Sequence, residues 1–447
     1  MQGANVFDGK KRLFELVEEI SSCRIDYVGY LRPTNEAEAM NDFLIDENMV
    51  RPDYEYGHID ISKIDKNRTR IRALLDEVQN SSDLAEELKA SFVKDLGQSW
   101  YCTELIMSAI DYNNGVEKTR AKHRFERASD AAFGRMHSDT FWSLLRERVA
   151  RISTKKLKKS DLEIYQELLS RIGVMGRNRK KHYVPDPKLV KEFGRKLRAL
   201  FQGAISHIPN DKNEFTPVEA ADIFNEIIKQ EYNIDFRAEV DKSLLTASTS
   251  ASRKRITIPG GRNNNYTRME LEKLIIHELG VHAVRAYSAA MSSLSVAAFP
   301  ESGAYSRLTE EGLAKVCEQA LDGKYDDICI VRYLSIGLAQ VCRKNFRETF
   351  EILWRLEHLV SKRTKEDCFS IVQRTFRGTG ELPINTDLFY YRGYALVWKY
   401  IAGHIHDDGL MATLFLSGKN DFLKQKRETL ARTMCEDGLI KKFMFDN

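Results

Sequence analysis

The stretch Leu271-Glu-Lys-Leu-Ile-Ile-His-Glu-Leu-Gly-Val-His-Ala-Val-Arg285 sets two histidines and a glutamate within an otherwise largely apolar run. Thr267 and Glu270 precede it with the spacing of a capping box, which marks the first turn of a helix. The two imidazoles are typical zinc ligands, and a carboxylate beside the first can take a proton from a water that the metal activates. The stretch therefore predicts a helix that carries a metal site.

The spacing of these histidines differs from the common H-E-x-x-H motif, in which they lie four residues apart on one helix face. His277 and His282 are five residues apart, so on a regular α-helix their side chains would diverge by roughly 140°. They can share one metal only if the helix is widened locally, as a π-bulge would do. Gly280 lies between them, where backbone freedom lowers the cost of a distortion. We predict a helix over residues 267–290 that is widened between residues 277 and 282; the alternative is two unrelated core histidines.

The composition is that of an ordinary globular protein. The chain has 447 residues, 43% hydrophobic and 30% charged, which is enough for two or three packed units. Its start has no apolar signal segment, and it contains no run of about 18 apolar residues that could span a membrane. Seven cysteines without a C-x-x-C pair favour a reducing compartment and argue against a cysteine-built zinc site. We expect a cytoplasmic protein with no membrane partner.

Positive charge is concentrated in one block of the chain. Residues 151–200 contain fifteen Lys or Arg and five Asp or Glu, although the net charge of the whole chain is only +4. Two hypotheses account for the block: a solvated helical face, or a docking surface for an acidic protein tail. Few aromatic residues interleave with the charges, which argues against nucleic acid as the partner.

The pattern along the chain divides it into three segments. Residues 1–65 are expected to form an N-terminal arm packing on the core, residues 66–205 a helical region with the basic block, and residues 206–447 a catalytic domain. A capping box at Thr216 and Glu219 starts a helix, and strands are expected at residues 235–240 and 255–259. Mostly helix with one small sheet is an α+β fold. Helical periodicity predicts further helices over residues 10–21, 68–80, 83–95, 98–112, 138–151, 161–172, 187–202, 309–322, 327–342, 345–361, 387–402 and 419–433.

A catalytic zinc site needs a third protein ligand besides two histidines. Glu310 and Glu311 stand at the start of the next predicted helix. A carboxylate in the first turn of a packed helix is held rigidly, as a metal ligand must be. Acidic residues at a helix N-terminus also complement the helix dipole without any metal. After two histidines and a glutamate in one motif, we favour a ligand.

Three motifs together resemble a known family. They are the H-E-x-x-x-H pattern at residues 277–282, Glu310-Glu-Gly-Leu-Ala314, and Arg374-Thr-Phe-Arg377-Gly378, followed by Asp387-x-x-Tyr390-x-x-Gly393. They are similar to motifs of the tyrosine carboxypeptidases related to the microtubule-associated enzyme that removes the C-terminal tyrosine of α-tubulin. Bacterial relatives are called QEGLA-motif proteins. Weaker likeness extends upstream to residues 35–56.

The resemblance implies a predominantly helical α+β protein with a zincin-like metallopeptidase core, a small β-sheet and an N-terminal helical region. It implies that His277, His282 and Glu311 bind one Zn²⁺ per chain and that Glu278 is the general base. The chain departs from the bacterial signature at Glu310, which replaces a glutamine. A second carboxylate therefore stands beside the proposed ligand, and the choice between Glu310 and Glu311 stays open. Nothing in the sequence identifies tubulin as the substrate.

A carboxypeptidase must also hold the terminal carboxylate of its substrate, and the planar fork of arginine suits that task. Arg374 and Arg377 are favoured because the nearby glycines indicate a close backbone approach. Tyr390 is the favoured donor to the oxyanion that develops during the reaction. The alternatives are Arg285 and Arg392 for the carboxylate, and Tyr391 and Tyr394 for the oxyanion. The strand at residues 254–259 is expected either to pair with an extended peptide or to serve inside the sheet.

The sequence thus predicts a zinc metallocarboxypeptidase that removes a C-terminal residue, an aromatic one if the family likeness extends to the substrate, from a peptide or protein. A zinc endopeptidase or amidohydrolase with the same metal site is one alternative. The other is a non-catalytic adaptor that docks acidic partners through residues 151–200. The glutamate beside His277 argues against the adaptor, because a structural metal site has no need of a base.

Overall fold

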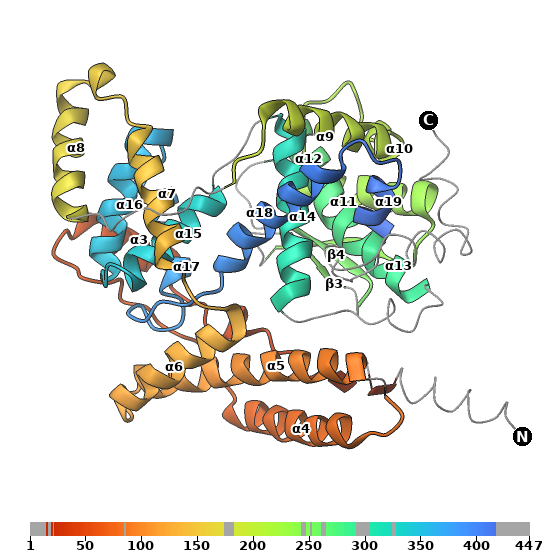
Figure 1. Ribbon diagram of the computed structural model, residues 1–447, viewed down its shortest axis with the longest axis horizontal. Coiled ribbons are helices and arrows are strands. Elements are labelled where there is room, and N and C mark those ends of the chain that lie inside the picture. The colour runs from red at the N-terminus through yellow and green to blue at the C-terminus, as the bar shows by residue number, and fades with distance from the viewer. Residues whose placement is uncertain are drawn as a thin grey trace, which may run out of the picture. The chain divides into compact units, whose positions relative to one another are not determined.

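The computed structural model describes residues 15–16, 19–20, 22–84, 86–173, 183–242, 247–250, 253–260, 265–291, 304–323 and 328–416. The chain forms two compact units: unit 1 contains residues 1–182 and 327–391, and unit 2 contains residues 183–326 and 392–447. Most of the described residues are helical and a few short strands complete the fold (Figure 1). The prediction of a mostly helical α+β protein is confirmed. The three-segment division at residues 65 and 205 stays a prediction, because it rests on composition and not on spatial grouping.

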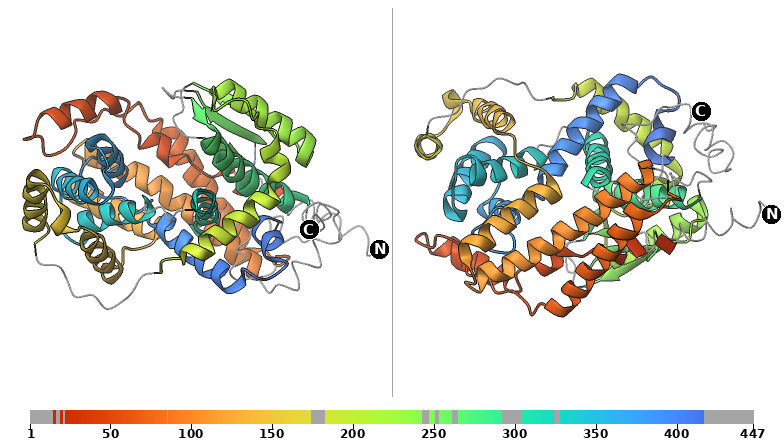
Figure 2. Two further views of the ribbon diagram at one scale, coloured as in Figure 1. Left: turned by 90° about the horizontal axis from the view of Figure 1, so that it is seen from above. Right: turned by 60° about the horizontal axis from the view of Figure 1, so that its bottom comes forward.

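Unit 1 consists of helices in its described part. Three of them, α4, α5 and α6, run alongside one another (Figures 1 and 2) and bury Ile64, Leu105, Ile106 and Phe125 between them. The helices of unit 1 are α2 (Tyr27–Tyr30), α3 (Glu36–Ile45), α4 (Ile61–Asn80), α5 (Glu86–Asn113), α6 (Lys118–Phe133), α7 (Ser138–Ala150), the 3₁₀ turn η1 (Thr154–Lys156), α8 (Lys159–Ile172), α15 (Ile328–Gln340), α16 (Phe346–Ser361) and α17 (Lys365–Thr375).

The segment between α3 and α4 is tied to the rest of unit 1 by backbone contacts. Arg347 of α16 donates to the carbonyl oxygens of Phe43, Asp46 and Met49 at 2.6–2.8 Å. An isolated antiparallel bridge joins Pro33 to Tyr56. These contacts hold residues 43–56 against the unit without any regular sheet.

Unit 2 surrounds a small sheet with helices. Its elements are α9 (Pro187–Leu200), α10 (Gln202–Ser206), β1 (Glu214–Phe215), α11 (Pro217–Ile227), the π-helix η2 (Ile228–Tyr232), β2 (Arg237–Asp241), β3 (Ser248–Ser250), β4 (Arg255–Pro259), β5 (Tyr266–Thr267), α12 (Arg268–Leu274), the π-helix η3 (Ile275–Val284), α13 (Arg285–Met291), α14 (Ala304–Asp322) and α19 (Leu410–Leu416). Helix α18 (Leu388–His404) begins in unit 1 and belongs to unit 2 from Arg392 onward.

The three-stranded sheet of unit 2 has the order β2-β4-β3, with β2 parallel and β3 antiparallel to β4. The strands expected at residues 235–240 and 255–259 are therefore present. The expectation that residues 254–259 could pair with a peptide is wrong, because β4 is the central strand and both of its edges are occupied. The edge strand beside it is β3, which the sequence pattern did not indicate.

Local sequence signals fix the helices that matter most for the site. Both predicted capping boxes form: Thr216 with Glu219 starts α11, and Thr267 with Glu270 starts α12. The continuous helix from α12 through η3 to α13 lies against the core of unit 2. Its buried side chains Leu271, Ile275, Leu279 and Ala283 pack there with residues of α11 and β4, including Phe224, Ile227, Ile256 and Ile258.

Several predicted boundaries differ from the structure. The helices expected over residues 83–95 and 98–112 are one helix, α5, which continues through Gly97. Helices α6, α17 and α19 were not predicted. The segment at residues 419–433 and most of residues 10–21 lie outside the described residues. No helix among the described residues is both long enough and apolar enough to cross a membrane.

Two glycines allow α14 and α18 to cross at close range within unit 2. A Cβ added to Gly312 would lie 2.4 Å from the backbone of Gly393, and one added to Gly393 would lie 2.0 Å from the carbonyl oxygen of Leu308. No side chain fits at either position, so glycine is required by the close approach of the two backbones. This crossing lies directly beside Glu311.

We predict that Gly393→Ala lowers the free energy of unfolding by about 1–3 kcal/mol or more, because the methyl group overlaps the backbone of α14. Gly403→Ala on the same helix is the matched control, since a Cβ there meets nothing within 4 Å. The control should be neutral or up to about 1 kcal/mol more stable. Chemical denaturation of both variants measures the difference, and equal stabilities would refute the tight crossing.

Candidate metal centre

The helix that carries the two histidines is widened where the sequence requires it. Residues Ile275–Val284 form the π-helix η3, so the predicted widening between residues 277 and 282 is confirmed and extends beyond them. In a π-helix each hydrogen bond spans five residues, which places side chains five apart on nearly the same face. The ring centroids of His277 and His282 lie 5.0 Å apart. The alternative of two histidines facing apart is therefore wrong.

Gly280 contributes clearance rather than an unusual backbone conformation. It is not among the residues with positive φ. A Cβ at this position would lie 2.7 Å from the ring of Phe201, which is itself fully buried. The glycine thus lets the widened turn sit close to an aromatic side chain of unit 2.

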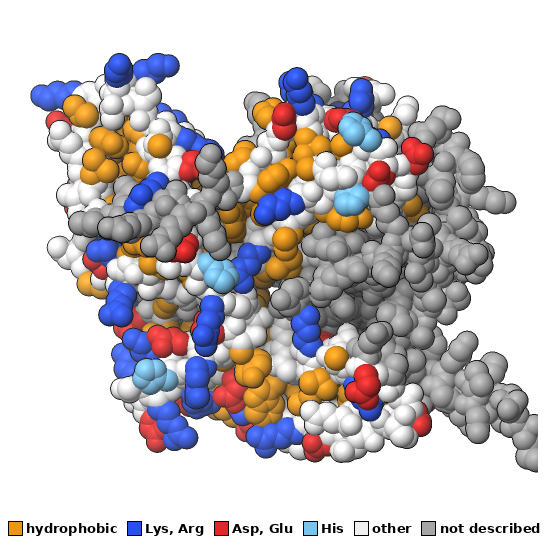
Figure 3. Space-filling view, in the orientation of Figure 1, with side chains coloured by type: hydrophobic (Ala, Val, Ile, Leu, Met, Phe, Trp, Pro, Cys, Tyr) orange, Lys and Arg blue, Asp and Glu red, His pale blue; other side chains and the backbone are white. Residues whose placement is uncertain are grey.

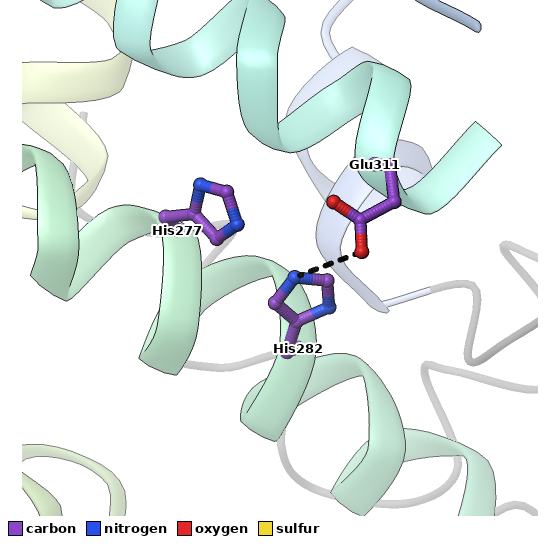
Figure 4. A group of neighbouring side chains, drawn as sticks. All are labelled: His277, His282 and Glu311. Carbon is purple, nitrogen blue, oxygen red and sulfur yellow. Dashed lines mark ion pairs between the residues drawn. The ribbon is translucent and has the colours of Figure 1, made fainter. Parts of the chain in front are cut away.

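A carboxylate from the neighbouring helix completes the group. Donor atoms of His277, His282 and Glu311 all lie within 4.8 Å of one another. Glu311 comes from α14 and faces the two rings (Figure 4), with 4.0 Å between its Oε1 and Nε2 of His282. Two imidazoles and one carboxylate are a donor set that suits a catalytic zinc and leaves one position open.

The position of the glutamate pair in its helix differs from expectation. Glu310 and Glu311 were expected in the first turn, but α14 begins at Ala304. They therefore lie about two turns inside the helix, where the helix dipole gives little reason for two adjacent acids because its effect is confined to the first turn.

The other ring nitrogen of each histidine is held by a second carboxylate. Nδ1 of His282 lies 2.8 Å from Oε1 of Glu310, and Nδ1 of His277 lies 2.5 Å from Oε1 of Glu318. Both contacts leave Nε2 directed to the shared site. Carboxylates bonded to the second nitrogen commonly orient histidines that bind zinc. This arrangement favours Glu311 as the ligand and gives Glu310 the orienting role.

Glu318 was not identified from the sequence. It lies seven residues after Glu311 on α14, hence on the same helix face. This spacing is the sequence signal that could have identified it. Lys315 donates to both of its oxygens, at 2.7 and 2.9 Å. Burial alone would raise the pKa of Glu318, but Lys315 and His277 lower it well below its usual range. The carboxylate is therefore charged and can orient the imidazole.

The same contact acts on His277 in the opposite sense. Burial would lower the pKa of His277, but its hydrogen bond to Glu318 and the nearby negative charges of Glu318 and Glu278 raise it. The imidazole sits in a strongly negative surrounding, which also favours a cation placed at Nε2.

Glu278 lies at the same site and is held by the sheet. Its side chain is 5% exposed. Thr249 of β3 donates to Oε2 of Glu278 at 2.7 Å and to its backbone carbonyl at 3.1 Å. The other oxygen, Oε1, lies 3.9 Å from Nε2 of His277. One carboxylate oxygen is thus anchored and the other faces the candidate ligand His277.

The predicted substrate-binding residues Arg374 and Arg377 and the predicted oxyanion donor Tyr390 belong to unit 1, whereas the three candidate metal ligands belong to unit 2. Arg374 makes a two-pronged ion pair with Asp387, with both N–O distances 2.7 Å. The guanidinium carbon of Arg332 lies over the ring of Tyr390, 5.2 Å from the centroid of that ring. The alternatives are placed as follows: Arg285 is fully buried in unit 2, Arg392 and Tyr394 are also in unit 2, and Tyr391 is in unit 1.

Three kinds of comparison relate the chain to known proteins. The family model described as microtubule-associated tyrosine carboxypeptidase matches residues 174–446. No match was found among curated proteins. Among solved structures, a protein from Colwellia psychrerythraea described as a lipoprotein is 12% identical, with a TM-score of 0.34. That match covers 82% of this chain and 66% of the other, so this chain spans slightly less than two thirds of its length. The family match covers more than half of this chain and includes the whole candidate metal centre.

We predict that Glu318→Ala weakens the binding of added Zn²⁺ by about 10- to 100-fold, because the imidazole of His277 loses the group that orients it. Competition with a chromophoric chelator measures the dissociation constant. Asp322→Ala is the matched control: this residue is on the same helix but pairs with Lys273, away from the histidines. Equal zinc affinity in the two variants would contradict an orienting role for Glu318.

Proposed function

The chain belongs to the microtubule-associated tyrosine carboxypeptidase family, and we propose that it is a zinc-dependent carboxypeptidase that removes an aromatic C-terminal residue from a peptide or protein. The observation that carries this proposal is the grouping of His277, His282 and Glu311 within 4.8 Å, beside the buried Glu278. A metallopeptidase needs three such donors and an adjacent base. The core of unit 2 is accordingly proposed to be zincin-like.

The donor set fits one zinc ion per chain. Nε2 of His277, Nε2 of His282 and a carboxylate oxygen of Glu311 would hold the ion, with Glu318 and Glu310 fixing the two rings. When bound, zinc supplies a Lewis acid that polarises the scissile carbonyl and makes water acidic enough to lose a proton near neutral pH. The remaining chemistry belongs to side chains of this protein.

Glu278 is proposed as the general base and then the general acid. Its Oε1 faces the site while Thr249 restrains Oε2. The carboxylate takes the proton of the attacking water and passes it to the nitrogen of the departing amino acid as the peptide bond breaks. The hydrogen bond from Thr249 keeps the base in one orientation through both transfers.

The proposed substrate is held by its backbone and its terminal carboxylate. The edge strand β3 carries Thr249 and is suited to pair with an extended peptide. Arg374 and Arg377 are proposed to recognise the carboxylate and Tyr390 to donate to the oxyanion. The description of the family, microtubule-associated tyrosine carboxypeptidase, indicates that tyrosine is the residue released. On that basis we propose an aromatic terminal residue for the substrate of this chain.

One observation supports a second, non-catalytic function. Lys155, Lys156, Lys158 and Lys159 are all exposed and form no ion pair within the described part of the chain. Figure 3 shows Lys and Arg side chains gathered over the end of α8 that follows η1. This surface suits an acidic protein tail, and binding that weakens steeply with salt would support it. Residues 177–181 of the predicted basic block lie outside the described residues.

We predict that the purified protein, incubated with a pool of peptides, removes single C-terminal residues, and that Glu278→Gln lowers the rate by about 10²- to 10⁴-fold because the proton acceptor is lost. Mass spectrometry of the products gives both the cleaved position and the side-chain preference. Glu278→Gln should still bind zinc, whereas His277→Ala should lose it.

Internal cleavage of the peptides would favour a zinc endopeptidase, and release of ammonia or other small amines an amidohydrolase. A protein that binds no zinc after metal-replete expression, or that cleaves equally well as Glu278→Gln, would contradict the proposed mechanism.

A further inference from the structure

Arg377, a half-buried arginine in unit 1, pairs with none of the residues that the structure describes. It follows α17 and forms no hydrogen bond or ion pair with any described residue. Burial lowers its pKa and the positive charge of Arg374 lowers it further. An unpaired charge removed from water is costly, so a native protein that keeps one at such a position has a reason to do so.

The charges around Arg377 do not balance. Arg374 already takes both oxygens of Asp387, and Arg332 lies 3.8 Å from the same carboxylate. Burial would raise the pKa of Asp387, but the three surrounding guanidiniums lower it to about 2. Three positive groups thus surround one negative group. An additional anion is what this cluster lacks.

The other acids nearby are already paired. Glu36, which lies within electrostatic range of Arg377, binds Arg32 at 2.8 Å. Glu381 is bound by Arg51 and Lys118. Neither carboxylate is therefore available to neutralise Arg377.

Two tyrosine hydroxyls within electrostatic range of Arg377 have no acceptor for their protons among the described residues. The hydroxyl oxygens of Tyr54 and Tyr56 are buried and donate to no acceptor within the part of the chain that the structure describes, although the backbone of Gly378 lies close enough to the Tyr56 oxygen to lower its pKa. Burial raises the pKa of both phenols, and the positive charge of Arg377 lowers the pKa of each. A buried hydroxyl without a partner costs about 1–3 kcal/mol. Two such donors next to an unpaired cation mark a place for an acceptor.

The backbone brings these groups together by close approach. Gly378 has a φ of +92° and Gly380 a φ of +69°. Glycine adopts such positive φ values without the steric cost that other residues incur. The turn that these two glycines form lies against the segment before α4: a Cβ at Gly380 would be 3.5 Å from the ring of Tyr54 and 3.8 Å from Arg51. The Arg377 turn and residues 51–56 are thus one packed element of unit 1.

We propose that Arg377, with the hydroxyls of Tyr54 and Tyr56, binds the carboxylate of an organic ligand in unit 1. We infer that the ligand is a peptide C-terminus or the amino acid released from it, and this identity rests on the proposed function. The site itself contains no residue assigned to the metal. Of the two arginines proposed for substrate binding, this assigns the role to Arg377, because Arg374 is already ion-paired with Asp387.

The surroundings favour an organic acid over a free inorganic anion. The rings of Tyr54 and Tyr56 have their centroids 6.3 Å apart, and the ring of Phe346 lies 6.4 Å from that of Tyr54. A guanidinium fork and two phenol donors match the two oxygens of a carboxylate, while the aromatic rings offer contact to an apolar side chain. Phosphate shares the oxyanion chemistry but gains nothing from the rings.

The test is calorimetric titration of the full chain after a chelator has removed its metal. The three titrants are N-acetyl-tyrosine, N-acetyl-tyrosinamide and inorganic phosphate. The acid should bind and the neutral amide should not. Arg377→Gln should weaken binding of the acid by roughly 10- to 100-fold. Tyr54→Phe and Tyr56→Phe should each weaken it by about 2- to 10-fold. Arg120→Gln, an exposed arginine of α6 in the same unit, is the control and should bind as the unmodified protein does.

Thermal unfolding of the ligand-free variants separates binding from structure. Since Arg377 pairs with no described residue and the two hydroxyls donate to none, Arg377→Gln and both Tyr→Phe variants should unfold at the same temperature as the unmodified protein or a higher one. Residues with a merely structural role would lower that temperature when replaced.

Equal binding of the acid and the amide would overturn the proposal, as would unchanged binding in Arg377→Gln, or binding of phosphate without binding of the acid. Because the metal is absent from every titration, these results do not depend on the zinc reaction. A protein without peptidase activity that still shows the predicted binding would overturn the proposed function and leave this site intact.

Discussion

The hydrogen-bond register of the helix through residues 275–284 is the constraint on which the candidate centre depends. In an α-helical register His277 and His282 would point roughly 140° apart, and no single ion could reach both rings. The π register instead places their centroids 5.0 Å apart. Such turns are rare in proteins and occur frequently at functional sites. Here the widened turn is held by core packing on the side away from the histidines, through Ile275 and Leu279, and by the clearance that Gly280 leaves for Phe201.

The second requirement is control of the imidazoles by carboxylates on α14. Glu310, Glu311 and Glu318 all come from that helix, so one rigid element supplies both the third donor and the two orienting groups. Its position is set by the close crossing at Gly312 and Gly393. Glu310 offers His282 a carboxylate acceptor at 2.8 Å, and carboxylates form stronger hydrogen bonds than neutral amides do. The geometry of the site thus depends on how closely α14 and α18 pack.

Features that depend on local sequence were predicted better than features that depend on packing. The five-residue spacing of the histidines required a wide helix, and capping boxes at Thr216 and Thr267 located two helix starts, because both are local signals. Glu318 was missed because its role depends on how α14 packs beside η3, which no local pattern reveals. The edge position of β3 was missed for the same reason, since its three residues carry a weak pattern and strand order is set by tertiary contacts. The break expected between residues 95 and 98 is absent, because a glycine such as Gly97 costs a long helix only about 1 kcal/mol.

Anomalous diffraction at the zinc absorption edge, from crystals grown with zinc, tests the central claim most directly. The account predicts a single strong peak per chain, about 2.0–2.2 Å from Nε2 of His277, Nε2 of His282 and a carboxylate oxygen of Glu311, with the helix in the π register. A peak bound by other residues, or a regular α-helix through residues 275–284 with the two rings apart, would contradict it.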